Sequence, residues 1–294
     1  MSFIDFARAH GVEVDPSRLY PSDKIKRCGT VDKPKSGNGA YFWDGQRGWV
    51  FDWSGEARTI WYEDPHAKPW TDEEKRQWAL KRQVANSEKD RAYELASEKA
   101  DIILKRADLK EHGYLVIKGF PEELGLVSED RLLIPMRNVV TNKLQGYQSI
   151  WWNMEERKYE KKMLLGMRAK NAVHRLGSKT ASETWLVEGY ATGLSVYHAL
   201  RSIGSDASVV VCFSASNLVQ VADQIKGQRF VFADNDESKT GEKSAEQTGL
   251  PWTMADTVGF DANDLHVKSG LFAVVGKIMQ LRKKVLTSVD ACRI

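Results

Sequence analysis

Five carboxylates of this 294-residue chain follow short apolar runs, in three separate segments. They belong to Glu188, to Asp234 and Asp236, and to Asp261 and Asp264. Short apolar runs bounded by turn residues are typical of buried parallel strands. The carboxyl ends of such strands line the crevice in which open α/β sheets bind ligands. Carboxylates that converge there would hold a hard divalent cation such as Mg²⁺, which prefers oxygen ligands and often shares them with substrate phosphates.

Each acidic segment also has a simpler interpretation when it is taken alone. An acid at a strand-to-helix turn, as Glu188 would be, can merely complement the dipole of the following helix. Asp234 and Asp236 would point the same way on an extended segment, which favours a cation between them, but they also suit an Asx turn. Asp261 and Asp264 suit a helix cap. The order of all three segments together favours a shared metal-binding cluster.

The segment that holds these acids is expected to alternate strands and helices. Strands are predicted at 184–187, 207–213, 229–233 and 253–258, and helices at 191–203, 217–225 and from 244–248 onward. Ser216 is the expected N-cap of the second helix, and Gly189 would allow a tight turn after Glu188. Such alternation predicts a parallel sheet with helices on both faces.

A basic segment precedes the acidic one. Residues 131–179 hold eleven Lys and Arg against three acids, whereas residues 185–270 hold six against eleven. This division suits a protein that holds phosphate groups with one part and cations with the other. Ordinary solvated surface is the alternative for the basic part. Strands are predicted there at 130–137 and 144–152, followed by a charged edge at 157–165.

The N-terminal part predicts a small β-rich module over residues 1–66, with Asp44-Gly45 as a hairpin turn between aromatic runs. Five of the ten tryptophans lie between Trp43 and Trp70. Most are expected in the core of the module, and one or two would stack on single-stranded bases. Residues 67–107 predict a charged linker helix that starts with a capping box of Thr71 and Glu74 and would break near Asn86-Ser87.

The order Glu-Gly, Asp-x-Asp, Asp-x-x-Asp, separated by strand–helix units, resembles the Toprim domain of bacterial-type primases, topoisomerases and some nucleases. Among these, it resembles the Toprim domains of primases encoded by phages and plasmids. The resemblance implies that Glu188 acts in acid–base chemistry or metal binding, that Asp234 and Asp236 bind metal, and that Asp261 and Asp264 form the third acidic element. Replicative primases usually have D-x-D in that element, and an aspartate at the position of Thr192.

The upstream segment is similar to the basic half of the primase catalytic core, which in that family holds template and nucleotide. The residues that the resemblance assigns to this role are Arg137, Lys161, Lys162, Arg168 and Lys170. Family members begin with a zinc-binding module, whereas Cys28 here has no partner cysteines nearby. Residues 1–66 therefore look like a related module without metal, in which Trp43, Trp49 and Trp53 would fill the space.

The expected organisation is a metal-free β-rich module (1–66), a linker helix (67–107), a basic α+β subdomain (108–182), a Toprim domain (183–270) and a C-terminal helix (271–294). The expected function is a primase that makes short RNA primers on single-stranded DNA by nucleotidyl transfer with Mg²⁺ or Mn²⁺. Its partners would be the template, nucleoside triphosphates and a replicative helicase on a separate chain, since no P-loop motif is present. A Toprim nuclease and a non-catalytic single-strand-binding or helicase-loading factor are the alternatives.

The remaining sequence features favour a cytoplasmic protein that does not enter a membrane. No apolar run reaches the length of a bilayer span, and the N-terminus lacks a secretory pattern. Cys28, Cys212 and Cys292 form no CxxC pair, which disfavours a disulfide framework and fits a reducing compartment.

Overall fold

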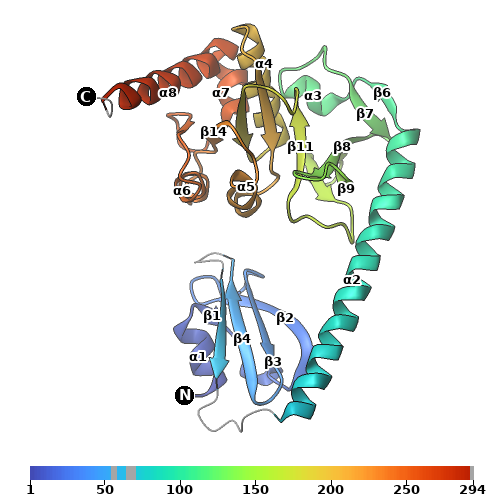
Figure 1. Ribbon diagram of the computed structural model, residues 1–294. Coiled ribbons are helices and arrows are strands. Elements are labelled where there is room, and N and C mark those ends of the chain that lie inside the picture. The colour runs from blue at the N-terminus through green and yellow to red at the C-terminus, as the bar shows by residue number, and fades with distance from the viewer. Residues whose placement is uncertain (54–57, 64–70, 292–294) are drawn as a thin grey trace. The chain divides into compact units, whose positions relative to one another are not determined.

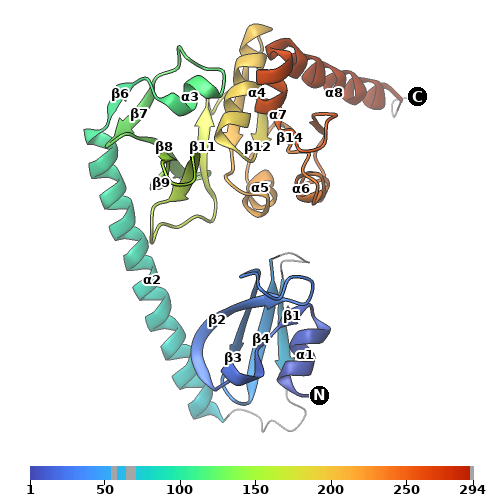
Figure 2. The ribbon, with the colours of Figure 1, turned by 180° about the vertical axis from the view of Figure 1, so that it is seen from behind.

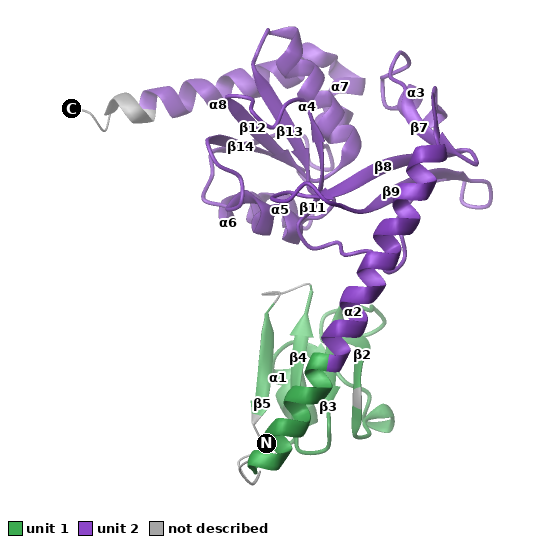
Figure 3. Cartoon of the chain, turned by 45° about the vertical axis from the view of Figure 1, so that its right-hand side comes forward, with its two compact units in different colours: residues 1–83 green, residues 84–294 purple. Residues whose placement is uncertain are grey.

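The computed structural model describes residues 1–53, 58–63 and 71–291, and the chain divides into two compact units (Figure 3). Unit 1 comprises residues 1–83 and unit 2 comprises residues 84–294. The predicted boundary between residues 66 and 67 lies outside the described ranges. Among the helices of the described ranges, none combines the length and the hydropathy that crossing a lipid bilayer requires.

Unit 1 is a five-stranded antiparallel sheet with a short helix packed against it (Figure 2). The strands, in both chain and sheet order, are β1 (Val12–Glu13), β2 (Ser22–Thr30), β3 (Gly39–Trp43), β4 (Arg47–Asp52) and β5 (Thr59–Glu63). The predicted hairpin is confirmed, because the Asp44 side chain accepts hydrogen bonds from the backbone amides of Gln46 and Arg47. Helix α1 (Phe3–Ala9), capped by Ser2 and Asp5, was not predicted, nor was the 3₁₀ turn at Pro16–Arg18.

The aromatic residues of unit 1 are divided between its core and its surface. Trp43 stacks on Phe3 with ring centroids 4.7 Å apart and packs against the core. Trp53 is half exposed and lies beneath the Arg27 guanidinium, 3.7 Å from the ring centroid. Trp61 is likewise exposed. Trp49 stacks on Phe42 and pairs across the strands with Trp61, outside this core. The prediction that most of these tryptophans are core residues is therefore wrong: of the four described, only Trp43 packs against the core. Trp70 lies outside the described residues.

Helix α2 (Asp72–Arg106) belongs partly to each unit. Its predicted capping box is present: the Glu74 amide donates to Thr71 Oγ1, and the Thr71 amide donates to Glu74 Oε2. The expected break near Asn86-Ser87 is wrong, because the helix continues through both residues. Only Ala96 and Ala100 are buried in it, so solvated charged side chains cover most of its length.

Unit 2 is built on one ten-stranded mixed sheet with helices (Figure 1). Its N-terminal strands are β6 (Asp108–Lys110), β7 (Gly125–Ser128), β8 (Arg131–Asn138), β9 (Leu144–Asn153), β10 (Lys158–Met163) and β11 (Ala172–Leu176). Its C-terminal strands are β12 (Glu183–Val187), β13 (Ala207–Val211), β14 (Gln228–Ala233) and β15 (Trp252–Met254). The main order is β10-β9-β8-β11-β13-β12-β14-β15, and β7 joins β6 to β8.

The C-terminal strands form the predicted parallel sheet with helices on both faces (Figure 2). Alternate residues of β12, β13 and β14 enter two cores, as expected for strands buried on both sides. One core includes α4 (Tyr190–Ser202), α7 (Ala262–Ser269), α8 (Leu271–Ala291) and the short α3 (Gly113–Ile117); the other includes α5 (Ala215–Ala222) and α6 (Thr240–Gln247). The N-cap of α5 is Ser214, which accepts from the Asn217 amide, and not Ser216 as predicted.

Strand β11 makes one sheet out of the basic and acidic halves. It pairs antiparallel with β8 on one side and with β13 on the other. The sequence predicted no strand here, because Ala172 to Leu176 is short and contains His174 and Arg175. The basic segment and the parallel strands consequently share a hydrogen-bonded framework.

Candidate active site

The fold brings the three acidic segments to one edge of the parallel strands. Strands β12 and β14 are adjacent and parallel, so Glu188 and Asp234, which directly follow them, leave the sheet at the same edge. The intervening Asn235 pairs with Phe260, whose carbonyl accepts from the Asn235 amide at 3.1 Å. That bridge places the start of α7, with Asp261, beside the Asp234 turn.

Asp234 is the least compensated of the five carboxylates. Its Oδ1 atom is buried and has no hydrogen-bond partner. Burial, followed by the nearby charges of Asp261, Glu188 and Asp236, raises the pKa of Asp234 to about 8, and Lys161 opposes this rise. A buried carboxylate among other acids is strongly disfavoured unless a proton or a cation neutralises it.

Asp236 is instead stabilised in its charged form. Its carboxylate accepts hydrogen bonds from the Ser238 hydroxyl and from the backbone amides of Thr240 and Gly241, at the start of α6. Burial by itself would raise the pKa of Asp236, but these hydrogen bonds lower it below the ordinary value. The Asx-turn interpretation is therefore correct for Asp236. Its Oδ1 atom accepts two of these hydrogen bonds and its Oδ2 atom accepts the third.

Glu188 lies half-buried at the turn between β12 and α4. Burial and the charge of Asp236 raise the pKa of Glu188, and a hydrogen bond from the Ala215 amide at the start of α5 partly offsets them. A carboxylate with a raised pKa is a stronger proton acceptor than an ordinary one. Gly189 has φ −96°, so the turn itself does not need glycine, contrary to the prediction.

Asp261 and Asp264 form the N-terminal capping box of α7. Asp261 Oδ1 accepts from the amides of Asn263 and Asp264, and Asp264 Oδ2 accepts from the Asp261 amide. The remaining Asp261 oxygen, Oδ2, accepts from the buried Thr192 hydroxyl at 2.9 Å. Thr192 thus supplies a hydrogen-bond donor to the third acidic segment. The helix-cap interpretation accounts for both aspartates.

The five predicted basic residues do not form one surface. Lys161 and Lys162 are neighbours on β10 and therefore point to opposite faces of the sheet. Lys161 Nζ lies 5.4 Å from the Tyr114 ring centroid and is close enough to Asp234 to lower the pKa of that residue. Lys162 Nζ lies over Trp151 on the other face, 5.5 Å from the ring centroid.

The other three basic residues lie at different places. The exposed Arg168 lies over the Tyr93 ring of α2, 5.8 Å from its centroid, and Lys170 is exposed in the same segment. Arg137, at the end of β8, donates from Nη1 to the Asn142 carbonyl. Among these five residues, Lys161 is the one whose charge acts on Asp234, so it is the candidate that faces the acids.

Tyr114 was not predicted as a site residue. It lies in α3, its ring is fully buried under Lys161, and its hydroxyl has no hydrogen-bond partner. Burial raises the pKa of Tyr114 to about 12, with Asp261 and Asp264 adding to the effect. No local sequence signal marks this residue, because α3 reaches the acidic edge only through the tertiary fold.

The donor set fits a divalent cation only in part. The unpartnered Oδ1 of Asp234 and its acidic neighbours are what a hard cation would satisfy. However, no three His, Cys, Asp or Glu side chains among the described residues are spaced to hold a metal ion. Mg²⁺ often binds through one or two carboxylates together with water and substrate phosphates. Asp234, with Asp236 or Glu188, would suffice for such a site.

Cys28 of unit 1 is a free thiol, and burial raises its pKa to about 11. The described residues of this unit contain no group of three His, Cys, Asp or Glu side chains that could hold a metal ion.

No family model matches this chain, and no curated protein matches it. Among solved structures, it is similar to the structure of the DnaG catalytic core, at 17% sequence identity and a TM-score of 0.35. That similarity covers 51% of this chain and about half, 52%, of the other. The function of the chain is therefore inferred from the side chains of the site itself.

Proposed function

We propose that this chain is a primase that synthesises short RNA primers on single-stranded DNA by metal-dependent nucleotidyl transfer. The observation that carries the proposal is Asp234: a carboxylate with a buried, unpartnered oxygen at the carboxyl end of a parallel strand. Other acids surround it, and the charge of Lys161 opposes the rise in its pKa. The resemblance of its segment to Toprim primases supports the same activity.

In this proposal each residue has a separate task. Asp234 and Asp236 hold Mg²⁺ or Mn²⁺, and the raised pKa of Glu188 suits it to take a proton from the attacking 3′-hydroxyl. When bound, the cation supplies charge neutralisation for the triphosphate of the incoming nucleotide. Lys161 contacts a phosphate from the opposite side of the site, while Asp261 and Asp264 fix the start of α7.

The template would follow the exposed cations of the basic half. Arg137, Arg168 and Lys170 are exposed, as phosphate-contacting side chains require. Lys162 faces away from Lys161, so it would contact nucleic acid only outside the catalytic edge. A replicative helicase on a separate chain remains the proposed partner.

An Asp234→Ala variant tests the assignment. Labelled single-stranded DNA is incubated with Mg²⁺ and with or without nucleoside triphosphates, and Asp223→Ala serves as the control at an exposed acid outside the site. We expect triphosphate-dependent oligomers from the wild type and the control, and none from Asp234→Ala. Template binding should persist in all three. Primer synthesis at the wild-type rate by Asp234→Ala would refute the site, and shortened DNA without triphosphates would indicate a nuclease.

A non-catalytic single-strand-binding or helicase-loading factor is the second candidate. It is favoured by the engagement of Asp261 and Asp264 in a helix cap and by the Thr192 hydroxyl that occupies Asp261. For such a protein, DNA binding would persist in EDTA, and no oligomers would form with any cation. The same assay therefore separates the two candidates.

A further inference from the structure

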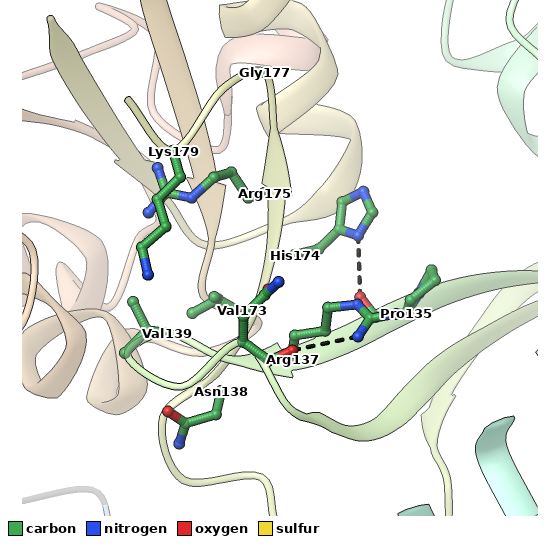
Figure 4. A pocket seen from close by; sticks show the side chains of 10 residues that line it. Pro135, Arg137, Asn138, Val139, Val173, His174, Arg175, Gly177 and Lys179 are labelled. Atoms are coloured by element: carbon green, nitrogen blue, oxygen red, sulfur yellow. Dashed lines mark hydrogen bonds between the residues drawn. The ribbon is translucent and has the colours of Figure 1, made fainter. Parts of the chain in front are cut away.

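A second site in unit 2 is a cavity of about 380 Å³ at the seam between β8 and β11 (Figure 4). Its lining residues are Pro135, Arg137, Asn138, Val139, Asn142, Val173, His174, Arg175, Gly177 and Lys179. The lining contains three permanent cations and no acid. This composition differs from that of the acidic edge, where carboxylates predominate.

The three cations have neutral hydrogen-bond partners. Arg175 Nη1 donates to Ser208 Oγ at 2.8 Å, and Lys179 Nζ donates to the Val140 carbonyl at 3.2 Å. Arg137 Nη1 donates to the Asn142 carbonyl at 3.3 Å. Within the described ranges, no carboxylate forms an ion pair with Arg137, Arg175 or Lys179.

Arg175 is the most unusual of the three, because it is partly buried, whereas Arg137 and Lys179 are exposed. Burial lowers its pKa, and no neighbouring acid compensates. A partly desolvated guanidinium without a counter-ion is costly, and an anion in the cavity would remove that cost. Guanidinium groups bind phosphate in a bidentate geometry that lysine cannot reproduce.

No carboxylate of the acidic edge lines the cavity. The Arg175 side chain reaches Ser208 near the start of β13, whereas Glu188 follows the carboxyl end of β12. The wall at Val173 lies nearer the acids, because the adjacent His174 pairs with Val211 at the end of β13. Because no acid lines the cavity, binding of an anion there would not require a divalent cation.

The rest of the lining suits a compact ligand. Pro135, Val139 and Val173 provide apolar wall, and His174 is held to the Pro135 carbonyl at 3.0 Å. Pockets of about 300–1,000 Å³ with mostly apolar walls and a few polar groups are typical of small-molecule sites. A nucleic-acid strand, in contrast, tracks along an extended basic groove.

We propose that this cavity binds a free phosphorylated small molecule of nucleotide size. Its phosphate groups contact Arg175 and Lys179, and its less polar part lies against Val139 and Val173. The proposed phosphate contacts involve neither Asp234 nor Lys161. Arg137 lines this cavity and also belongs to the template path proposed above.

The test is titration calorimetry on the full chain in EDTA, with ADP as the probe. Lys179→Glu is compared with Lys226→Glu, which makes the same charge change at an exposed lysine outside the cavity. We expect ADP to bind the wild type and Lys226→Glu equally, and Lys179→Glu about tenfold or more weakly, since hydrogen bonds to charged groups contribute that much. Arg175→Lys keeps the positive charge but loses the planar guanidinium group, so it should weaken ADP binding less than Lys179→Glu does.

Two competitors identify the source of the phosphate. Inorganic pyrophosphate should displace ADP, which would support the anion contacts. A single-stranded oligonucleotide that displaces ADP at equal phosphate concentration would overturn the small-molecule assignment. Absence of ADP binding at millimolar concentration, or equal affinity in Lys179→Glu and the wild type, would overturn the site itself.

Discussion

At the scale of the residue, the buried Asp234 carboxyl group should make the stability of the folded chain depend on pH. Because the pKa of Asp234 is raised from 3.8 to about 8 in the folded chain, the folded state holds a proton that the unfolded state loses. The stabilisation that this proton provides is at its maximum below about pH 4. It is lost as the pH rises from about 4 to 8, and stability no longer depends on this group above about pH 8.

Asp234→Asn should therefore become progressively more stable than the wild type between pH 4 and pH 8 in EDTA. The slope should approach, at its steepest, about 1.4 kcal/mol for each pH unit. Urea denaturation across this range measures the difference. If Mg²⁺ binds at Asp234, its addition at pH 8 should stabilise the wild type and leave the Asn variant unchanged. Parallel stability curves for the two proteins would contradict the raised pKa.

Thr192 gives the second prediction at this scale. Its buried hydroxyl donates to Asp261 Oδ2, so Thr192→Val leaves a carboxylate oxygen without a donor and should cost about 1–3 kcal/mol. Thr192→Ser keeps the donor and should cost less. Thermal unfolding compares them, and equal losses in both variants would show that the methyl group matters rather than the hydrogen bond.

At the scale of the element, the backbone at the start of α6 lies in close contact with the backbone at Asp234. A Cβ atom on Gly241 would lie 2.2 Å from the Asp234 carbonyl oxygen, which backbone atoms cannot accommodate without shifting. Gly241→Ala should move α6, weaken the amide contacts to Asp236 and destabilise the chain by more than 1 kcal/mol.

Gly276→Ala is the matched control for that variant. Gly276 lies inside α8, and nothing lies within 4 Å of a Cβ built there. Because alanine is the better helix former, the change should stabilise the chain by about 0.5–1 kcal/mol. Denaturation of the two variants should therefore give opposite signs. A neutral Gly241→Ala would show that the packing of α6 does not constrain the acidic edge.

The sequence predicted the elements that have a strong local signal. The parallel strands were found because Trp185 to Val187 and Phe230 to Ala233 are unbroken apolar runs, and the α2 capping box was found from Thr71 and Glu74. Strand β11 was missed because His174 interrupts the apolar pattern of this short segment. The segment forms a strand because it pairs with β8 and β13.

The candidate site was predicted only as far as its acids. The meeting of Glu188 and Asp234 follows from parallel topology, which the strand–helix alternation indicated. The roles of Tyr114 and of the Ala215 amide could not be predicted, since both reach the edge from distant elements. The sequence did not predict that Lys161 and Lys162 point to opposite faces, because it did not show that they belong to a strand.

At the scale of the whole molecule, α2 connects two units that have separate cores. Its middle is exposed on all sides, so the folding of each unit should not depend on its continuity. Ala85→Pro should interrupt the helix at a cost of about 3 kcal/mol to local helicity. Hydrogen exchange of the β12 and β14 amides should remain as slow as in the wild type; faster exchange there would show that the units depend on each other.

The antiparallel strand β11 has a consequence for how ligands would be accommodated in unit 2. Two residue pairs connect β11 to β8 and three connect it to β13. The basic and acidic halves therefore cannot rotate away from each other without breaking backbone hydrogen bonds. Substrates would enter and leave the site through rearrangements of loops and side chains alone. Little binding energy would be spent on closure, and free and ligated forms of this unit should have nearly superimposable backbones.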